Sequence, residues 1–396
     1  MWQVPLWLRI LRQLAINKID PIYLMGPSER EPEPLPVPSK AAVEWIPSAE
    51  ELHLKRAPGS ECIVVGANWV LDDALIKYLS SHLEPAVMAL SQQLEFAGAA
   101  RVPWETLGTL DLRSGSDGVG EALLNLAQAG KLKILPIADL PGYRSDLRRV
   151  LPVFAHPVRT QEDLAKAQEL VLDATQKGTN DLPAQYIHPP VENALVHLLV
   201  PRGVSANAVT TLSIFCALSV VYLFYFGYLL TGILLAMLVG ILDGVDGKIA
   251  RVKLESSRLG DWYDHLFDYL YEAFWYLALG AYLSRQTGLS EYWAAAGFMC
   301  GVYYLDRAVL GIWKLFRNYD FHELSDWDRT FRRICGRRNN IIYLLLPFFL
   351  LGHPELGFWT ALFWWTVTFL VHFLRVSRAL VLKIGQDAKS GAPLRR

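Results

Sequence analysis

The sequence predicts a mainly α-helical membrane protein, a six-transmembrane-helix bundle preceded by a cytoplasmic α/β domain. Two observations lead to this fold class. Long apolar stretches dominate after about residue 208, whereas Pro, Glu, Lys and Gln are frequent before it. In the earlier half, short strand-like runs alternate with helical periodicity, which is typical of an α/β layer fold. The 52% hydrophobic content is therefore an average over two unlike halves.

Residues 1–40 are interpreted as an N-terminal segment and linker. The opening MWQVPLWLRILRQLAI mixes Trp, Leu and Ile with Arg9 and Arg12, and it lacks the long apolar core and cleavage site of a secretory signal. It suits either a short helix at the membrane interface or a helix that packs on the soluble domain. Gly26–Lys40 is rich in Pro and charged residues, as expected of a linker or an extended surface segment.

The soluble α/β domain is predicted over residues 41–184. Strand character is found in ECIVVGANWV (Glu61–Val70), PAVMAL (Pro85–Leu90) and LKILPIAD (Leu132–Asp139). Helical periodicity is found in DDALIKYLSSHL (Asp72–Leu83) and in EDLAKAQELVLDATQK (Glu162–Lys177).

The membrane domain is predicted over residues 185–384, followed by a C-terminal tail, 385–396. Pro189 and Pro190 are expected to break the chain, and Val191–Val200 to form a short helix along the bilayer surface. Because about 20 apolar residues cross a bilayer, six spans are expected. They lie near residues 208–227, 229–249, 260–283, 290–315, 339–352 and 357–381.

Basic residues concentrate in two of the predicted loops. The loop between the second and third spans carries Lys248, Arg251, Lys253 and Arg258. The loop between the fourth and fifth carries Lys314, Arg317, Arg329, Arg332, Arg333, Arg337 and Arg338. The loops on the other side offer only Arg285. By the positive-inside rule both basic loops and the N-terminal domain are expected to face the cytoplasm. If the protein is bacterial, the membrane is the inner membrane.

Charge and cysteine content indicate which kinds of partner and compartment suit the protein. The net charge of −1 argues against a general nucleic-acid-binding surface. The four cysteines show neither a zinc spacing nor a disulfide framework, which fits a reducing compartment. They are Cys62, Cys216, Cys300 and Cys335.

Four carboxylates are the candidate functional centre. Asp243 and Asp246 are three residues apart, and Asp264 and Asp268 are four apart, so each pair shares a helical face. If the second and third spans are neighbours, all four converge at their cytoplasmic end. Like charges in a low dielectric need neutralising cations. All-oxygen ligands favour Mg²⁺ or Mn²⁺ over zinc.

Small residues and one arginine accompany these acids. Gly247, Ala250 and Gly260 leave room for a bulky ligand. Arg251 lies one turn beyond Gly247, where its guanidinium is suited to a phosphate. Carboxylates, divalent ions, small residues and an arginine together indicate a diphosphate site.

The spacing D-x2-D-G-x2-A-R-x8-G-x3-D-x3-D, which runs from Asp243 to Asp268, resembles the signature of the class-I CDP-alcohol phosphotransferases. The resemblance covers roughly Gln185–Leu382. It implies a fold of six transmembrane helices, often in a homodimer. It also implies an enzyme that transfers a phosphoalcohol from a CDP-alcohol to an acceptor hydroxyl and releases CMP. VSANAVT (Val204–Thr210) looks like the family's entry into the first span, although Ala206 stands where Pro is common.

The resemblance also implies roles for the signature residues. The four acids would hold two divalent ions, Mg²⁺ or Mn²⁺, and Asp268 would also be the general base on the acceptor hydroxyl. The remaining signature positions would line the CDP site together with Asp243. These are Gly247, Ala250, Arg251 and Gly260.

Other polar residues of the membrane half have two interpretations each. Arg337 and Arg338 form either a juxtamembrane patch facing anionic lipid or a site for a phosphorylated acceptor, as related enzymes suggest. Asp306 and Arg307 form either a mutually compensating pair or part of an acceptor site. Two histidines on apolar segments are expected to be packed or interfacial, and Asp261 is expected to cap a helix. The histidines are His197 and His372.

The N-terminal half is distantly similar to the nucleotidyltransferase-like domain that some relatives carry. It lacks a Gly-rich, Arg/Lys-bearing nucleotide loop, and Asn68 stands where an Asp would bind metal. We interpret it as a noncatalytic domain.

Three classes of function are weighed: a membrane transferase, a cation transporter and a noncatalytic scaffold. The leading hypothesis is a membrane transferase of phospholipid biosynthesis that uses CDP-diacylglycerol as donor and an alcohol such as a phosphorylated polyol as acceptor. A soluble CDP-polyol such as CDP-inositol is the alternative donor. A divalent-cation transporter would explain the acids but not the small residues and arginine at fixed spacing, and a scaffold with a decayed site would not keep the complete acid set.

Overall fold

The computed structural model describes the chain except residues 3, 26–40, 47–48, 56–58, 83, 91–94, 145–146, 256–257, 318 and 391–396; for residues 49, 53, 258–268 and 383–390 it describes the backbone only. The expected linker Gly26–Lys40 therefore lies outside the described residues. The chain forms two compact units. The N-terminal unit comprises Met1–Arg144, Val150–Gln176 and Ala250–Glu255, and the C-terminal unit comprises Ser145–Arg149, Lys177–Ile249 and Ser256–Arg396.

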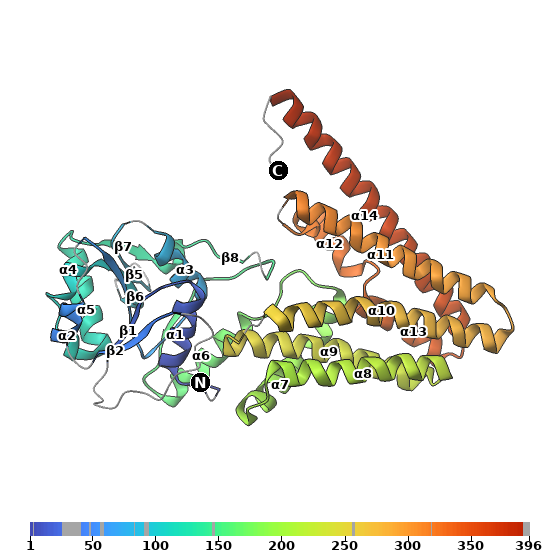
Figure 1. The fold of residues 1–396 in the computed structure, drawn as a ribbon, viewed down its shortest axis with the longest axis horizontal. Helices are drawn as coiled ribbons and strands as arrows, with labels where there is room; N and C mark the ends of the chain where they lie inside the picture. The colour runs from blue at the N-terminus through green and yellow to red at the C-terminus, as the bar shows by residue number, and fades with distance from the viewer. Residues whose placement is uncertain are drawn as a thin grey trace. The chain divides into compact units, whose positions relative to one another are not determined.

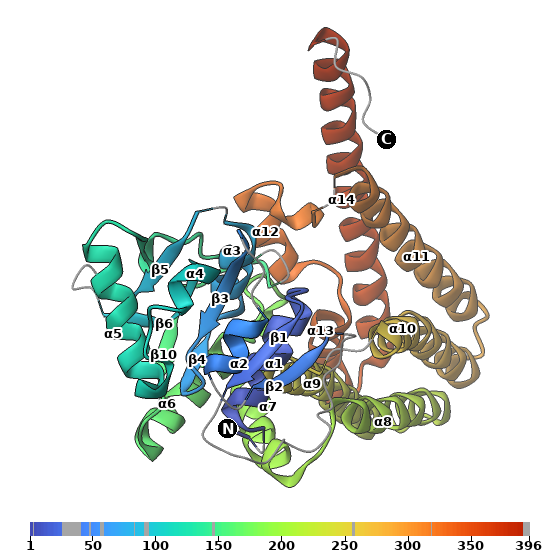
Figure 2. The ribbon, with the colours of Figure 1, turned by 60° about the vertical axis from the view of Figure 1, so that its left-hand side comes forward.

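A four-stranded sheet forms the centre of the N-terminal unit, with the strand order β3-β6-β5-β7. Strand β6 is antiparallel to both β3 and β5, whereas β5 and β7 are parallel. The parallel pair requires a crossover, and helix α5 lies within it and packs on β5, β6 and β7 (Figure 2). The bounds are β3 Glu61–Val65, β5 Ala86–Ala89, β6 Phe96–Pro103, β7 Lys133–Pro136 and α5 Gly115–Gln128.

Smaller elements complete this unit. Strands β1 and β2 pair in parallel, and β4 pairs antiparallel with β10. The strands are β1 Ile22–Met25, β2 Val43–Ile46, β4 Trp69–Leu71, β8 Tyr143–Arg144, β9 Arg149–Val150 and β10 Ala155–Pro157; of β9, only Val150 belongs to this unit. The helices are α1 Leu6–Ile16, α2 Ala49–Leu54, α3 Asp73–Ser81, α4 Trp104–Leu107 and α6 Gln161–Asp173.

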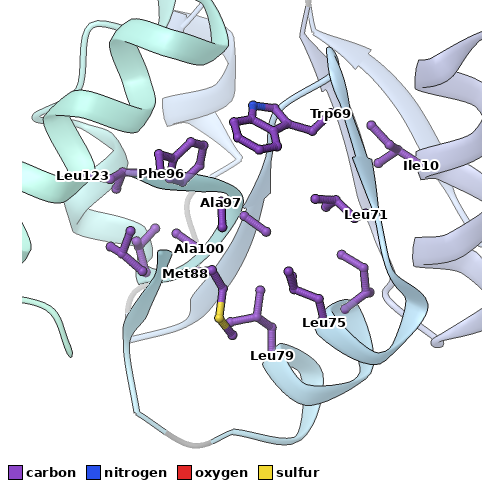
Figure 3. Packing of buried hydrophobic residues seen from close by; sticks show 14 of the residues in the cluster. Ile10, Trp69, Leu71, Leu75, Leu79, Met88, Phe96, Ala97, Ala100 and Leu123 are labelled. Carbon is purple, nitrogen blue, oxygen red and sulfur yellow. The ribbon is translucent and has the colours of Figure 1, made fainter. Parts of the chain in front are cut away.

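The core of the N-terminal unit lies between the sheet and its helices. Figure 3 shows Leu75 and Leu79 of α3 beside Met88, and Leu123 of α5 beside Phe96. Apart from Phe96, which is 9% exposed, these side chains are completely buried. The α/β pattern expected from the sequence is thus present in this unit.

The run Glu61–Val70, predicted as one strand, forms two. The chain turns after β3, where Gly66 N donates to Gly98 O at 2.9 Å, and β4 begins at Trp69. The Trp69 indole fills the space beside both glycines, because a Cβ at Gly98 would lie 2.6 Å from it. Gly98 also has a φ of +78°, a conformation that favours glycine. Burial of one indole therefore ends the strand that the sequence pattern continues.

Helix α1 is part of the N-terminal core. Leu8, Leu11 and Leu14 belong to the same buried cluster as the sheet residues. Arg12 Nη1 donates to Lys253 O at 2.7 Å, within the same unit, and buried Gln13 donates to Leu71 O at 2.9 Å. Of the two interpretations of this segment, the helix that packs on the soluble domain is the one observed.

The C-terminal unit is helical. Helices α8 and α10 run side by side, α10 packs on α11, and α14 packs on α11 and α13 (Figure 1). The bounds are α7 His188–Leu199, α8 Ala206–Phe226, α9 Leu229–Lys253, α10 Arg258–Thr287, α11 Glu291–Arg317, α12 Asp326–Ile334, α13 Arg338–Leu350 and α14 Pro354–Ser390. Short turns of helix cover Pro183–Ile187, Val200–Arg202 and Phe321–Glu323.

Aromatic residues fill the centre of this unit. Trp275, Tyr276 and Trp365 are each no more than 1% exposed. Trp365 Nε1 donates to the Tyr276 hydroxyl at 2.6 Å, and this hydroxyl donates to Glu272 Oε1 at 3.1 Å. The buried polar atoms of Trp365, Tyr276 and Glu272 are thus linked in one chain of hydrogen bonds, as burial in an apolar bundle favours.

A helix is present at each of the six predicted spans. Three of them are long and apolar enough to cross a membrane in the part of the chain that the structure describes, namely Ala206–Phe226, Leu229–Lys253 and Pro354–Leu382. Helix α13, at the fifth predicted span, has 13 residues and contains Pro347. The number of spans and the cytoplasmic orientation stay predictions.

The expected break at Pro189 and Pro190 is wrong. Helix α7 begins at His188, so both prolines lie in its first turn. A proline is tolerated there because the first amide groups of a helix have no intrahelical partner. The helix is therefore longer than the predicted segment Val191–Val200.

Candidate functional site

Helix α9 carries the first half of the signature. Asp246 is 6% exposed, and its Oδ2 accepts a hydrogen bond of 2.6 Å from the hydroxyl of Thr210 in α8. Asp243, one turn earlier, keeps 34% of its side chain exposed. One carboxylate is therefore fixed by a neighbouring helix, while the other is accessible to a ligand. Gly247, Ala250 and Arg251, which follow on the same helix, are half-buried.

The basic segment before α13 reaches the signature. Arg338 Nη2 lies 3.0 Å from Asp243 Oδ2, and the Arg338 residue is 9% exposed. A partly buried guanidinium beside a carboxylate makes a strong, oriented pair. The structure thus brings together one predicted metal ligand and one predicted acceptor residue.

Arg337 contacts a different acid. Its Nε lies 3.6 Å from Asp181 Oδ2, and Asn339 Nδ2 lies 3.3 Å from Asp181 Oδ1. Asp181 is 5% exposed and also accepts a hydrogen bond of 3.1 Å from Ala184 N. Arg337 and Asn339 are therefore held by a buried carboxylate that precedes α7, a contact that no local sequence pattern indicates.

Close packing holds two helices, α13 and α7, against α9. A Cβ at Gly240 would lie 2.5 Å from Asn339 Oδ1, and a Cβ at Gly244 would lie 2.1 Å from Glu192 Oε1. Glycines at four-residue spacing let another helix approach the backbone. Here they allow buried polar groups to lie directly beside the helix that bears Asp243.

A buried ion pair follows the glycines on α9. Lys248 Nζ lies 2.9 Å from Glu192 Oε2 and donates to Asn193 Oδ1 at 2.6 Å. The Lys248 and Glu192 side chains are 3% and 5% exposed. Lys248, assigned above to a cytoplasmic loop, is therefore a buried helical residue. Arg251 and Lys253 also belong to α9.

The second half of the signature lies on α10. Gly260, Asp264 and Asp268 fall within Arg258–Thr287, but their side chains lie outside the described residues. Asp264 and Asp268 are one helical turn apart, as the spacing predicts. The meeting of all four carboxylates stays a prediction, as do the role of Asp261 and that of each site residue.

The described donors fit a hard divalent cation. Asp243 and Asp246 offer carboxylate oxygens, and Thr210 adds a hydroxyl beside them. Oxygen donors of this kind suit Mg²⁺ and Mn²⁺. The Asp243 side chain, which is 34% exposed, is accessible to an ion and to the ligand of that ion.

Asp306 and Arg307 are a compensated pair inside the bundle. Arg307 Nη2 lies 3.6 Å from Asp306 Oδ2, and its guanidinium lies 5.4 Å from the Tyr303 ring centre. Asp306 is completely buried, and its Oδ1 lies 2.6 Å from Nδ1 of buried His372. His197, by contrast, is exposed on α7.

Asn68 belongs to the turn between β3 and β4. Its carbonyl accepts a hydrogen bond of 2.7 Å from Val158 N. Its side-chain Oδ1 is buried and has no hydrogen-bond partner among the described residues. The residue as a whole is half-buried.

Residues 204–372 match the model of the CDP-alcohol phosphatidyltransferase family. Over 232 residues the chain is 23% identical to the bifunctional IPC transferase and DIPP synthase of Aquifex aeolicus, which covers 58% of this chain and 50% of that protein. A protein of the same name from Archaeoglobus fulgidus is 28% identical over 210 residues, 52% of this chain and 40% of its own length. Another, from Rubrobacter xylanophilus, is 28% identical over 243 residues, 61% and 48% of the two chains. The chain spans about half the length of the curated relatives it matches.

Proposed function

We propose, on the premise that residues 204–372 form a CDP-alcohol phosphatidyltransferase domain, that this chain transfers a phosphoalcohol group from a CDP-alcohol to an acceptor hydroxyl and releases CMP. The observation that carries the proposal is the ion pair of 3.0 Å between Asp243 and Arg338. It joins the acid signature to the basic segment on which a phosphorylated acceptor would bind.

The acids of the signature would bind the metal. Asp243 and Asp246, with Asp264 and Asp268 from α10, would hold two ions of Mg²⁺ or Mn²⁺. When bound, such ions neutralise the diphosphate and stabilise the departing CMP. Thr210 contributes by fixing the Asp246 carboxylate through its 2.6 Å hydrogen bond.

The reaction is a direct displacement at phosphorus. The acceptor oxygen attacks the phosphorus that bears the alcohol, the bond from that phosphorus to the bridging oxygen breaks, and CMP leaves with the bridging oxygen. Asp268 takes the proton of the acceptor hydroxyl. Gly247, Ala250, Arg251 and Gly260 would line the CDP site with Asp243.

Arg338 and Arg337 would bind a phosphate on the acceptor. Both guanidinium groups are positioned by carboxylates, Asp243 and Asp181, at 3.0 and 3.6 Å. Such anchoring leaves the remaining N–H groups of an arginine oriented for a second anion. This supports a phosphorylated polyol as acceptor, and it argues against a cation transporter, because Arg338 places a fixed positive charge beside the acids. Arg307 pairs with Asp306, so it is a weaker candidate for binding the acceptor.

Two donors are proposed. CDP-diacylglycerol suits a transferase whose helices are apolar enough to span a membrane, since a lipid enters between such helices. CDP-inositol, a soluble donor, is favoured by the names of the relatives, IPC transferase and DIPP synthase. The N-terminal unit is proposed to be noncatalytic, because Asn68, a neutral and weak ligand, stands where an Asp would bind metal.

The test is CMP release by the detergent-purified full chain. CDP-diacylglycerol, CDP-inositol and CDP-glycerol are each supplied with Mg²⁺ or Mn²⁺ and a panel of free and phosphorylated alcohols. Metal-dependent CMP release that one acceptor stimulates supports the proposal, and the active donor identifies the product. The absence of CMP release with every donor would refute it.

A further inference from the structure

Three buried side chains that the proposed reaction does not use meet in the C-terminal unit. His322 belongs to the short turn Phe321–Glu323, Cys335 follows the end of α12, and His372 lies within α14. Their ligand atoms all lie within 4.8 Å of one another. The three residues are 1%, 0% and 1% exposed. The sequence shows no zinc spacing here, because three separate segments supply the residues.

The two imidazole rings face each other through the same atom. Nε2 of His322 lies 3.3 Å from Nε2 of His372. Two nitrogens that each bind zinc at about 2.0–2.1 Å with tetrahedral geometry are about 3.3–3.4 Å apart. The observed separation is therefore the one that a shared tetrahedral ion requires.

Carboxylates hold the other nitrogen of each ring. His322 Nδ1 lies 2.8 Å from Asp320 Oδ1, and His372 Nδ1 lies 2.6 Å from Asp306 Oδ1. A histidine that donates from Nδ1 to a carboxylate presents a lone pair at Nε2, which is how metal-binding histidines are usually oriented. Two lone pairs that face each other at 3.3 Å repel unless a cation or a proton lies between them.

Arg332 allows a second, metal-free arrangement. Its Nη1 lies 3.0 Å from His322 Nδ1; if it donates there, His322 carries its proton on Nε2 and donates to His372. The contact of His322 Nδ1 with Asp320 is shorter, however, and Arg332 has other acceptors. Its Nε donates to Thr179 O at 3.1 Å, and its Nη1 lies 3.7 Å from Asp320 Oδ2. The carboxylate assignment therefore fits better.

We propose that His322, Cys335 and His372 bind a zinc ion, at a site separate from the acid cluster. One thiolate and two neutral imidazoles suit zinc, whereas the acid cluster offers oxygen donors that suit Mg²⁺ or Mn²⁺. The rings of Phe321 and Phe331, with centres 5.8 and 5.4 Å from that of His372, help to shield the site from water. The ion would join the turn before α12, the end of α12 and α14.

The position of Cys335 gives the ion a structural role. The next residue, Gly336, donates from its backbone N to Thr368 Oγ1 at 2.7 Å, and a Cβ there would lie 3.1 Å from Trp365. The chain then continues to Arg338, which pairs with Asp243. Zinc on Cys335 would thus fix the start of α13 and, through it, the Arg338 guanidinium.

Elemental analysis of the purified full chain tests the site without relying on activity. Cells are grown with added zinc, and the protein is washed in a buffer that contains Mg²⁺. About one zinc per chain is expected, with loss of most of it in Cys335→Ser and in His372→Gln. Cys300→Ser is the matched control, because Cys300 is a buried thiol that donates to Ala273 O at 3.4 Å. Asp246→Asn, which alters the acid cluster, is also expected to keep zinc.

Thermal unfolding of the unmodified chain covers the case in which the variants fail to fold. A strong chelator should lower Tm, and added Zn²⁺ but not Mg²⁺ should restore it. Three results would overturn the proposal in favour of the metal-free hydrogen-bonded arrangement. The protein could contain no zinc after growth with zinc, or both ligand variants could retain it equally. The third such result is a Tm that neither the chelator nor Zn²⁺ changes.

Discussion

Replacing Thr210 with valine removes one hydroxyl from the site and keeps the shape of the side chain. This hydroxyl donates to Asp246 Oδ2 at 2.6 Å, and Asp246 is 6% exposed. Thr210→Val should therefore leave a buried carboxylate with one donor fewer and with more freedom to turn away from a metal. The second contact of the hydroxyl, with Ala206 O at 3.2 Å, is a local helix bond whose loss costs little.

The expected size follows from the charge on Asp246. A hydrogen bond to a charged group is worth about 1.5–3 kcal/mol. Since 1.36 kcal/mol corresponds to a factor of ten, kcat/KM for CMP release should fall by about 10- to 150-fold. The concentration of Mg²⁺ or Mn²⁺ that gives half-maximal rate should rise, because the metal binds a less ordered carboxylate. Thr210→Ser, which keeps the hydroxyl, should recover most of the rate.

Thr211→Val is the matched control on the same helix. Thr211 is exposed, and its hydroxyl donates at 2.8 Å to Asn207 O, away from the acids. This variant should keep wild-type metal dependence. Equal kinetics in Thr210→Val and Thr211→Val, whether both unchanged or both reduced, would refute the role given to the Thr210 hydroxyl.

Three further predictions concern packing, the acceptor and a thiol. Gly244→Ala should lower Tm, because its Cβ would lie 2.1 Å from Glu192 Oε1 and overpacking costs about 1–3 kcal/mol. Arg338→Met should raise KM for a phosphorylated acceptor more than tenfold, as loss of a charge-assisted contact of about 1.5–3 kcal/mol implies, and a free alcohol acceptor should be affected less. Burial raises the pKa of the Cys62 thiol to about 12, so alkylation of the folded protein at pH 9 should be on the order of a hundred- to a thousandfold slower than that of an exposed cysteine.

Matched variants and conditions accompany these three. Gly297→Ala adds a Cβ with no atom within 4 Å and should leave Tm unchanged; an equal loss in both glycine variants would contradict the packing argument. Arg329→Met changes an exposed arginine and should leave KM for the acceptor unchanged. For Cys62, mild unfolding should bring alkylation to the rate of an exposed cysteine, and fast alkylation before unfolding would contradict the raised pKa.

Local patterns predicted the elements well. The periodicity of Glu162–Lys177 and the apolar runs at Pro85–Leu90 and Leu132–Asp139 correspond to α6, β5 and β7. In each case the residues that decide the structure are neighbours in sequence. The prediction of a single strand over Glu61–Val70 was wrong. The turn that interrupts this run involves the Trp69 indole, which packs beside Gly98, a residue distant in sequence.

The candidate site was predictable only where its signal is local. The signature on α9 and α10 is a run of fixed spacings, and the sequence contains all of it. The partners of that signature come from other segments, and no spacing relates Thr210 to Asp246 or Asp181 to Arg337. The sequence predicts that Lys248 lies in a loop, whereas its burial depends on an ion pair with Glu192 of another helix.

The central claim is tested most directly by CMP release from Asp268→Asn beside Asp261→Asn, with the donor and acceptor that the wild-type protein uses. Both substitutions remove one carboxylate from α10, but only Asp268 belongs to the signature. The account predicts that Asp268→Asn loses at least a hundredfold in kcat, within the range of 10²–10⁴ typical of a general base, while Asp261→Asn stays near wild type. Full activity in Asp268→Asn, with the same metal dependence, would contradict it.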